Sequence, residues 1–150
     1  MYKLIESDVH NGHLLHRIEA TDTMCFGNFI IKPGTRGGWI ESESNLGETA
    51  WVADEAMVYD DAIVTGNAPL FVTMPRSIVR GYSKVMDNAC ICQDAQVFGY
   101  AVIRNDAMIS GNAKVINCAE VSDSARVCDH AIVSSSAKIS DCAIVCGNAR

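Results

Sequence analysis

Small apolar residues recur along this sequence at a fixed interval. From Ala89 onward an alanine stands at every sixth position, up to Ala149. Two residues after each of these alanines except the last comes a valine or an isoleucine, and the two positions before it are mostly Gly, Asn, Asp or Ser. In an extended chain the alanine and the branched residue face one side, and the residue between them faces the other. Each six-residue unit is therefore predicted to be a short strand followed by a turn.

A period of six excludes an α-helix, whose apolar positions recur every three or four residues. Turn residues that tolerate left-handed backbone angles bend the chain by roughly a third of a revolution in each unit. Three units then close one triangular coil, and successive coils stack about 4.8 Å apart through parallel ladders of hydrogen bonds. The sequence predicts an all-β fold, a parallel β-helix of about six triangular coils filled by Ala, Val and Ile.

The same spacing begins earlier in the chain and is interrupted once. It runs from Ala50 to Ala68, but the next equivalent residue, Ser77, follows after nine residues instead of six. Three additional residues are therefore predicted to enlarge one corner of the coil at residues 72–76.

The N-terminal segment lacks the six-residue pattern. Residues 2–5 and 14–20 are strand-like, and Asn11-Gly12 between them is a strong signal for a two-residue hairpin turn. Such a hairpin is expected to cap the first coil, whose open edge would otherwise pair with another chain. We expect residues 1–39 to form this cap and the entry turn, and residues 40–150 to form one continuous β-helix.

One wall of the predicted coil is almost free of charge on its outer side. A surface of this kind is too apolar to stay in contact with water, so it predicts an interface between copies of the chain. The predicted interface residues are Trp51, Phe71, Cys90, Cys92, Met108, Arg126, Cys128, Ile144 and Cys146.

The composition limits the cellular compartment and the classes of binding partner that we expect. The 150 residues suit one domain, and no apolar run approaches the roughly 20 residues that cross a bilayer. The start of the chain is charged and unlike a signal segment, so we expect a cytoplasmic protein without a membrane partner. A net charge of −6 argues against binding to duplex nucleic acid. Seven cysteines, an odd number, are expected to be free thiols in a reducing compartment.

The six-residue units of residues 40–150 resemble the left-handed parallel β-helix of the hexapeptide-repeat superfamily, which includes many acyltransferases. The segments Leu15–Ala20 and Lys32–Leu46 look like the start of YdcK-like bacterial and phage proteins. The resemblance implies left-handed winding and a homotrimer whose walls pack around a three-fold axis, and it allows a phage origin.

The same resemblance suggests an enzymatic alternative. In an acyltransferase, a histidine between subunits would act as general base while CoA lies along the coils. His130 is the only histidine within the predicted coils, and it is the candidate catalytic residue. Superfamily transferases carry a long loop and a C-terminal segment that help to hold CoA, whereas here we expect a three-residue insertion and no tail. CoA or acetyl-CoA is a cofactor only under this alternative.

No metal site is expected. His10, His13 and His16 could gather a metal near the hairpin, but their alternation along a strand favours polar surface positions. Cys128 and Cys146 should be neighbours in adjacent coils at a separation that permits a disulfide. Their parallel side-chain directions and the expected reducing compartment favour packed thiols.

Scattered cations are the candidates for anion binding. Arg76, Arg80 and Arg126 are singled out because a guanidinium presents a rigid donor fork to phosphate or carboxylate, although long cationic side chains also cover β surfaces. We expect a trimeric binding or scaffold protein that needs no cofactor. It would sequester a small anionic ligand, such as a nucleotide or a metabolite, or block a protein partner. The alternatives are an acyl-CoA-dependent acetyltransferase and a purely structural or filament-forming protein.

Overall fold

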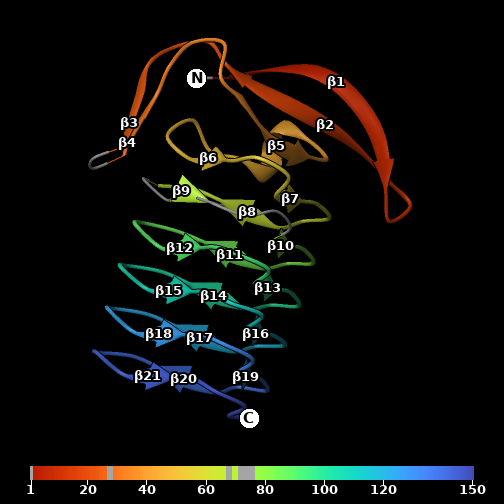
Figure 1. Ribbon diagram of the computed structural model, residues 1–150. Coiled ribbons are helices and arrows are strands. Elements are labelled where there is room, and N and C mark those ends of the chain that lie inside the picture. The colour runs from red at the N-terminus through yellow and green to blue at the C-terminus, as the bar shows by residue number, and fades with distance from the viewer. Residues whose placement is uncertain (1, 27–28, 67–68, 71–76) are drawn as a thin grey trace.

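The computed structural model describes residues 2–26, 29–66, 69–70 and 77–150, and these residues are almost entirely strands and turns. Stacked coils make up most of the molecule, and the N-terminal strands lie at one end of the stack (Figure 1). Within the described ranges, no helix has the length and hydropathy of a membrane span.

The N-terminal elements are β1 (Tyr2–His10), β2 (His13–Ala20), β3 (Met24–Phe26), β4 (Phe29–Ile31), β5 (Arg36–Ile40) and the 3-10 helix η1 (Glu43–Asn45). Two-residue strands follow: β6 (Trp51–Val52), β7 (Met57–Val58), β8 (Ile63–Val64), β9 (Pro69–Leu70), β10 (Ile78–Val79), β11 (Lys84–Val85), β12 (Cys90–Ile91), β13 (Gln96–Val97), β14 (Val102–Ile103), β15 (Met108–Ile109), β16 (Lys114–Val115), β17 (Glu120–Val121), β18 (Arg126–Val127), β19 (Ile132–Val133), β20 (Lys138–Ile139) and β21 (Ile144–Val145).

The short strands stack into three faces, which confirms the predicted parallel β-helix. The first face contains the strands in the order β1-β2-β5-β7-β10-β13-β16-β19. The second contains β8-β11-β14-β17-β20, and the third contains β12-β15-β18-β21. Strands β6 and β9, which come earlier in the chain than β12, form a separate pair. All strand pairs from β5 onward within these faces are parallel. Strands β7 to β21 make about five regular turns, and β5, Leu46 and β6 form an irregular turn before them.

The register of the strands confirms the single insertion. In the regular turns, paired residues are 18 positions apart, as in Val97↔Val115. Between β8 and β11 they are 21 positions apart, as in Val64↔Val85. Three additional residues therefore lie in this turn. The predicted enlarged corner, residues 72–76, falls outside the described residues.

The inside of the coil contains the repeating apolar residues. The alanines from Ala89 to Ala131 are fully buried, and so is the branched residue after each of them, apart from slight exposure of Val133. Because three walls meet beside each alanine, small side chains suit these positions.

Polar side chains hold successive corners together. Many turn residues have positive φ angles, as the choice of Gly, Asn and Asp predicts. At the corners, Asp60 accepts a hydrogen bond from the backbone N–H of Gly81 at 3.0 Å, and Asp123 accepts one from Asp141 at 3.2 Å. These bonds satisfy backbone donors that the bent chain leaves outside the strand ladders.

The N-terminal hairpin extends the first face. β1 and β2 pair antiparallel, β2 pairs antiparallel with β5, and β5 pairs parallel with β7. β5 crosses the expected boundary between residues 39 and 40, so one sheet runs from the hairpin into the coils. A second hairpin, β3–β4, was not predicted.

Candidate functional site

A groove of about 450 Å³ runs along one corner of the coil over four successive turns. Its lining forms two columns, one before and one after the corner alanines, and the residues within each column are 18 positions apart. The columns are Asp94, Asn112, His130 and Asn148, and Gln96, Lys114, Ile132 and Arg150. The groove therefore follows directly from the stacking of the coils.

The lining of the groove is mostly polar, and two of its side chains, Lys114 and Arg150, are cationic. Lys114, His130 and Arg150 are exposed, and Asp94 is the one acidic side chain among the lining residues. The three amide side chains of the lining both donate and accept hydrogen bonds. Small-molecule sites have volumes of roughly 300–1,000 Å³, so this groove has a suitable size. It suits a polar ligand that carries negative charge.

His130, the predicted catalytic residue, lies in this groove. Its backbone N–H donates to the carbonyl oxygen of Gly147 at 3.0 Å, which fixes the turn that carries it. Within the described part of the chain, no carboxylate pairs with its imidazole ring. The neighbouring Asp129 instead accepts a hydrogen bond from the backbone of Gly147. The described residues thus provide no partner that would orient His130 as a base.

Of the arginines singled out from the sequence, Arg80 and Arg126 do not line the groove. The guanidinium carbon of Arg80 lies 4.7 Å from the ring centre of Phe98, on the first face. Arg126 is exposed on β18 of the third face, and Arg76 lies outside the described residues. Sequence reasoning missed Lys114 and Arg150. Their separation by two coil lengths was the signal that could have found them.

The three N-terminal histidines have separate partners. His10 packs on Trp39 with ring centres 4.7 Å apart, and Nδ1 of His16 lies 2.7 Å from the hydroxyl of Ser7. They do not gather into one cluster.

His13 lies between two carboxylates. Its Nδ1 is 3.1 Å from Oε1 of Glu41, and its Nε2 is 3.7 Å from Oδ1 of Asp60. The hydrogen bond with His13 is the main cause of a lowered pKa of the Glu41 carboxyl group. These contacts join the N-terminal hairpin to the first coils.

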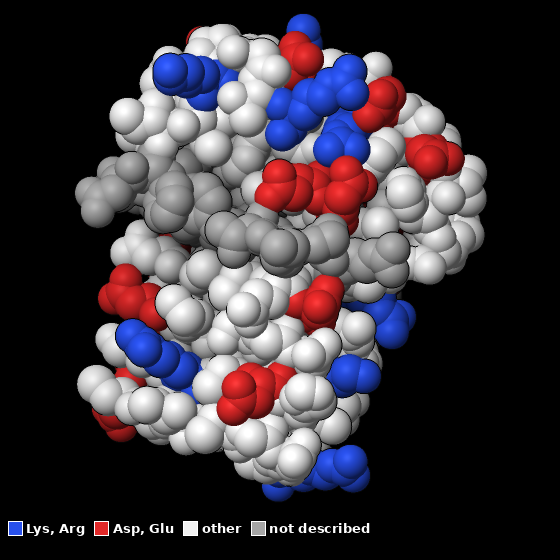
Figure 2. All heavy atoms as spheres, viewed as in Figure 1, with Lys and Arg blue, Asp and Glu red and all other residues white. Residues whose placement is uncertain are grey.

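The third face has an exposed apolar surface, which we call the apolar face. Cys90, Met108, Arg126 and Ile144 align in register on β12, β15, β18 and β21. Met108 is 36% exposed and Ile144 is 63% exposed. Cys92, Cys128 and Cys146 follow these strands and are partly or fully exposed. In the view of Figure 2, the surface of the lower part of the molecule, which holds the coils, is mostly uncharged, and its charged groups are separated from one another.

Trp51 lies on the same side but is covered by its own chain. Its side chain is only 1% exposed and packs in one cluster with Ile18. A Cβ atom at Gly37 would lie 2.7 Å from the Trp51 ring, so only glycine allows this close packing. Trp51 therefore does not belong to the exposed apolar face. Phe71, also predicted for the interface, lies outside the described residues.

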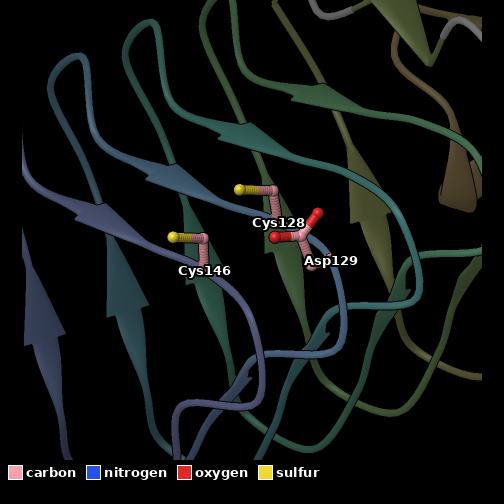
Figure 3. A group of neighbouring side chains, drawn as sticks. All are labelled: Cys128, Asp129 and Cys146. Atoms are coloured by element: carbon pink, nitrogen blue, oxygen red, sulfur yellow. The ribbon is translucent and has the colours of Figure 1, made fainter.

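Two cysteine pairs lie on the third face. A hydrogen bond from the Cys90 side chain lowers the pKa of the Cys92 thiol to about 7. Cys128 and Cys146 lie in neighbouring turns beside Asp129 (Figure 3). Burial, and then the proximity of Asp129 and Cys146, raise the pKa of the Cys128 thiol.

A comparison with protein-family models finds no match for this chain, and a comparison with curated proteins finds no relative. The resemblance to hexapeptide-repeat and YdcK-like proteins therefore rests on the residues quoted above.

Proposed function

We propose that this protein is a trimeric binding protein that holds a small anionic ligand in the corner groove of its coils. The observation that carries this proposal is the meeting of Lys114 and Arg150 in one groove whose lining has a single acidic side chain, Asp94. Because the chain as a whole has a charge of −6, this local excess of cationic groups differs from the overall balance.

The spacing of the two strong cations indicates the kind of ligand. Lys114 and Arg150 occupy equivalent positions two turns apart, which corresponds to roughly 10 Å along the stack. Amide side chains on Asn112 and Asn148 lie in the neighbouring column. A nucleotide, or a metabolite with two separated acidic groups, matches this alternation of cations and hydrogen-bonding groups.

The apolar face supports assembly into a trimer. Met108 and Ile144 expose apolar side chains in one column, and Arg126 is the one charged residue among the outward residues of β12, β15, β18 and β21. Burying such a surface against other copies is favourable by roughly 25 cal/mol for each Å² of apolar area. The threefold arrangement itself comes from the family resemblance.

Ligand titration tests the groove. We expect phosphate-bearing nucleotides to raise the melting temperature of the wild-type protein, and isothermal titration calorimetry to give a dissociation constant. Lys114→Ala or Arg150→Ala should each weaken binding about tenfold or more, because a hydrogen bond to a charged group contributes roughly 1.5–3 kcal/mol.

Lys84→Ala is the matched control, since Lys84 is an exposed lysine at the equivalent position of β11 on the second face. A wild-type protein that binds no member of a panel of nucleotides and acidic metabolites would contradict the proposal. An equal loss of binding in the Lys84 variant would contradict the assignment to the groove.

The position of His130 favours one second candidate, an acyl-CoA-dependent acetyltransferase. Under this reading His130 would take a proton from an acceptor while the groove holds part of CoA. Incubation with acetyl-CoA and a panel of amines and alcohols, followed by mass spectrometry of the released CoA, separates the two candidates. CoA release that His130→Ala abolishes supports the enzyme, and unchanged acetyl-CoA supports the binding protein.

A further inference from the structure

We propose that Cys128, Asp129 and Cys146 form a binding site for Zn²⁺. Cys128 and Asp129 follow strand β18, and Cys146 follows β21 in the next turn. All three ligands come from one chain, so the site needs neither the trimer nor the ligand groove.

The parallel stacking of the coils brings the three side chains together. Val127 pairs with Val145, which places Cys128 and Cys146 at equivalent positions in adjacent turns. Figure 3 shows that their sulfur atoms point the same way and that the Asp129 carboxylate lies on the other side of the two cysteines in this view. One ligand atom from each residue lies within 4.8 Å of the others.

These distances are close to those of a tetrahedral zinc centre. Bond lengths of about 2.3 Å to sulfur and about 2.1 Å to oxygen place two ligand atoms roughly 3.5–3.8 Å apart. Binding of the ion therefore requires the three side chains to rotate toward one another.

The local backbone already holds the ligands in position. Oδ2 of Asp129 accepts the backbone N–H of Gly147 at 3.0 Å, which leaves the other carboxylate oxygen for a cation. The backbone N–H of Cys128 donates to the carbonyl oxygen of Val145 at 2.9 Å. A hydrogen bond to a ligating carboxylate, such as that from Gly147 to Asp129, orients the ligand and increases metal affinity.

The set of donors selects the metal. Two thiolates and one carboxylate favour zinc over magnesium or calcium, which prefer oxygen ligands alone. In the single chain Cys128 is partly exposed, and Asp129 and Cys146 are exposed, so an ion reaches the site before this face meets another copy. Water can then complete the four ligands, as it does in open zinc sites.

Titration with Co²⁺ tests the site directly, because cobalt bound to thiolates absorbs in the near ultraviolet and visible range. Protein treated with a chelator and kept reduced should bind one Co²⁺ per chain with a thiolate-to-cobalt absorption band, and Zn²⁺ should remove the band. Cys128→Ser and Cys146→Ser should each abolish it. Asp129→Asn should weaken Co²⁺ binding about tenfold or more and keep the thiolate band.

Cys118→Ser and Cys142→Ser are the controls, because both remove exposed cysteines outside the cluster and should leave the titration unchanged. Circular dichroism and thermal melting of each variant establish that the coil is folded. Absence of a thiolate-to-cobalt band in reduced, folded wild-type protein would overturn the proposal. So would a band that persists in folded Cys128→Ser and Cys146→Ser variants.

Discussion

Single polar residues at the corners determine how one turn is joined to the next. Asp123 accepts hydrogen bonds from the backbone N–H of Asp141 and from the side chain of Asn105, which lies 2.8 Å away. The first of these bonds is the main cause of a lowered pKa of the Asp123 carboxyl group. A carboxylate that stays ionised in the folded state links stability to pH.

The sign of this linkage follows from the lowered pKa. The ionised Asp123 favours the folded state at all pH values above the ordinary pKa of about 4 for an unfolded aspartate. This contribution is lost as the pH falls through the lower pKa of the folded state. We therefore expect Asp123→Asn to lower stability at pH 7 and to flatten the loss of stability below about pH 4, as measured by denaturant unfolding at a series of pH values.

Asp61→Asn is the matched control, because Asp61 is exposed and makes no hydrogen bond or ion pair within the described residues. The proposed link between the ionisation of Asp123 and stability is wrong if Asp123→Asn and the wild-type protein lose stability in parallel as the pH falls.

At the scale of single residues, the sequence predicts the coil well and the groove poorly. The Gly, Asn and Asp positions indicate the corners, because only these residues adopt left-handed angles at low cost. Lys114 and Arg150 belong to different six-residue units, so no local pattern links them. Their joint position becomes visible only when the sequence is arranged in columns of 18 residues.

Among the elements, the N-terminal hairpin depends on Arg17 for its contact with the coil. The Arg17 side chain is only 16% exposed, and its Nη1 lies 2.8 Å from Oε1 of Glu55. Its guanidinium carbon also lies 5.1 Å from the ring centre of Trp39. Arg17 thus links β2 to β5 and to the turn before β7.

Arg17→Ala should destabilise the protein by about 1–2 kcal/mol, because it removes a charged hydrogen bond and a cation–π contact. Equilibrium unfolding in urea measures this change, and hydrogen exchange should show faster opening of β1 and β2. Lys3→Ala is the control, since Lys3 forms an ion pair with Glu19 but is 57% exposed. Equal destabilisation by both variants would show that Arg17 has no special role.

The sequence predicts the first hairpin but not the second. Asn11-Gly12 marks the turn between β1 and β2, whereas Gly27-Asn28 between two short apolar runs was a weaker signal for β3–β4. The burial of the Trp51 side chain could not be predicted from the local sequence pattern either. Alternation places residue 51 on the outside of the coil, and only the packing of distant residues such as Ile18 and Gly37 shows what covers it.

Across the whole molecule, repetition is the reason that the fold follows from the sequence. One six-residue unit specifies a strand, a corner and a register, and stacking copies of it determines all three faces. The proposed association of copies is indicated by a single sequence only through an apolar surface.

The apolar face makes a testable prediction about assembly. Ile144→Asp should dissociate the trimer, because it buries a charge without a partner in the interface. Val9→Asp is the matched control, since Val9 is 64% exposed on the hairpin and Ile144 is 63% exposed on the apolar face. Size-exclusion chromatography with light scattering should show a change of mass for the first variant alone.

Native mass spectrometry of the wild-type protein is the most direct test of the central claim that copies of this coil associate through the apolar face. We expect a species of three chains, each of 16.2 kDa, at micromolar concentration, and dissociation of this species in Ile144→Asp. A folded wild-type monomer with Met108 and Ile144 open to labelling from solvent would contradict it.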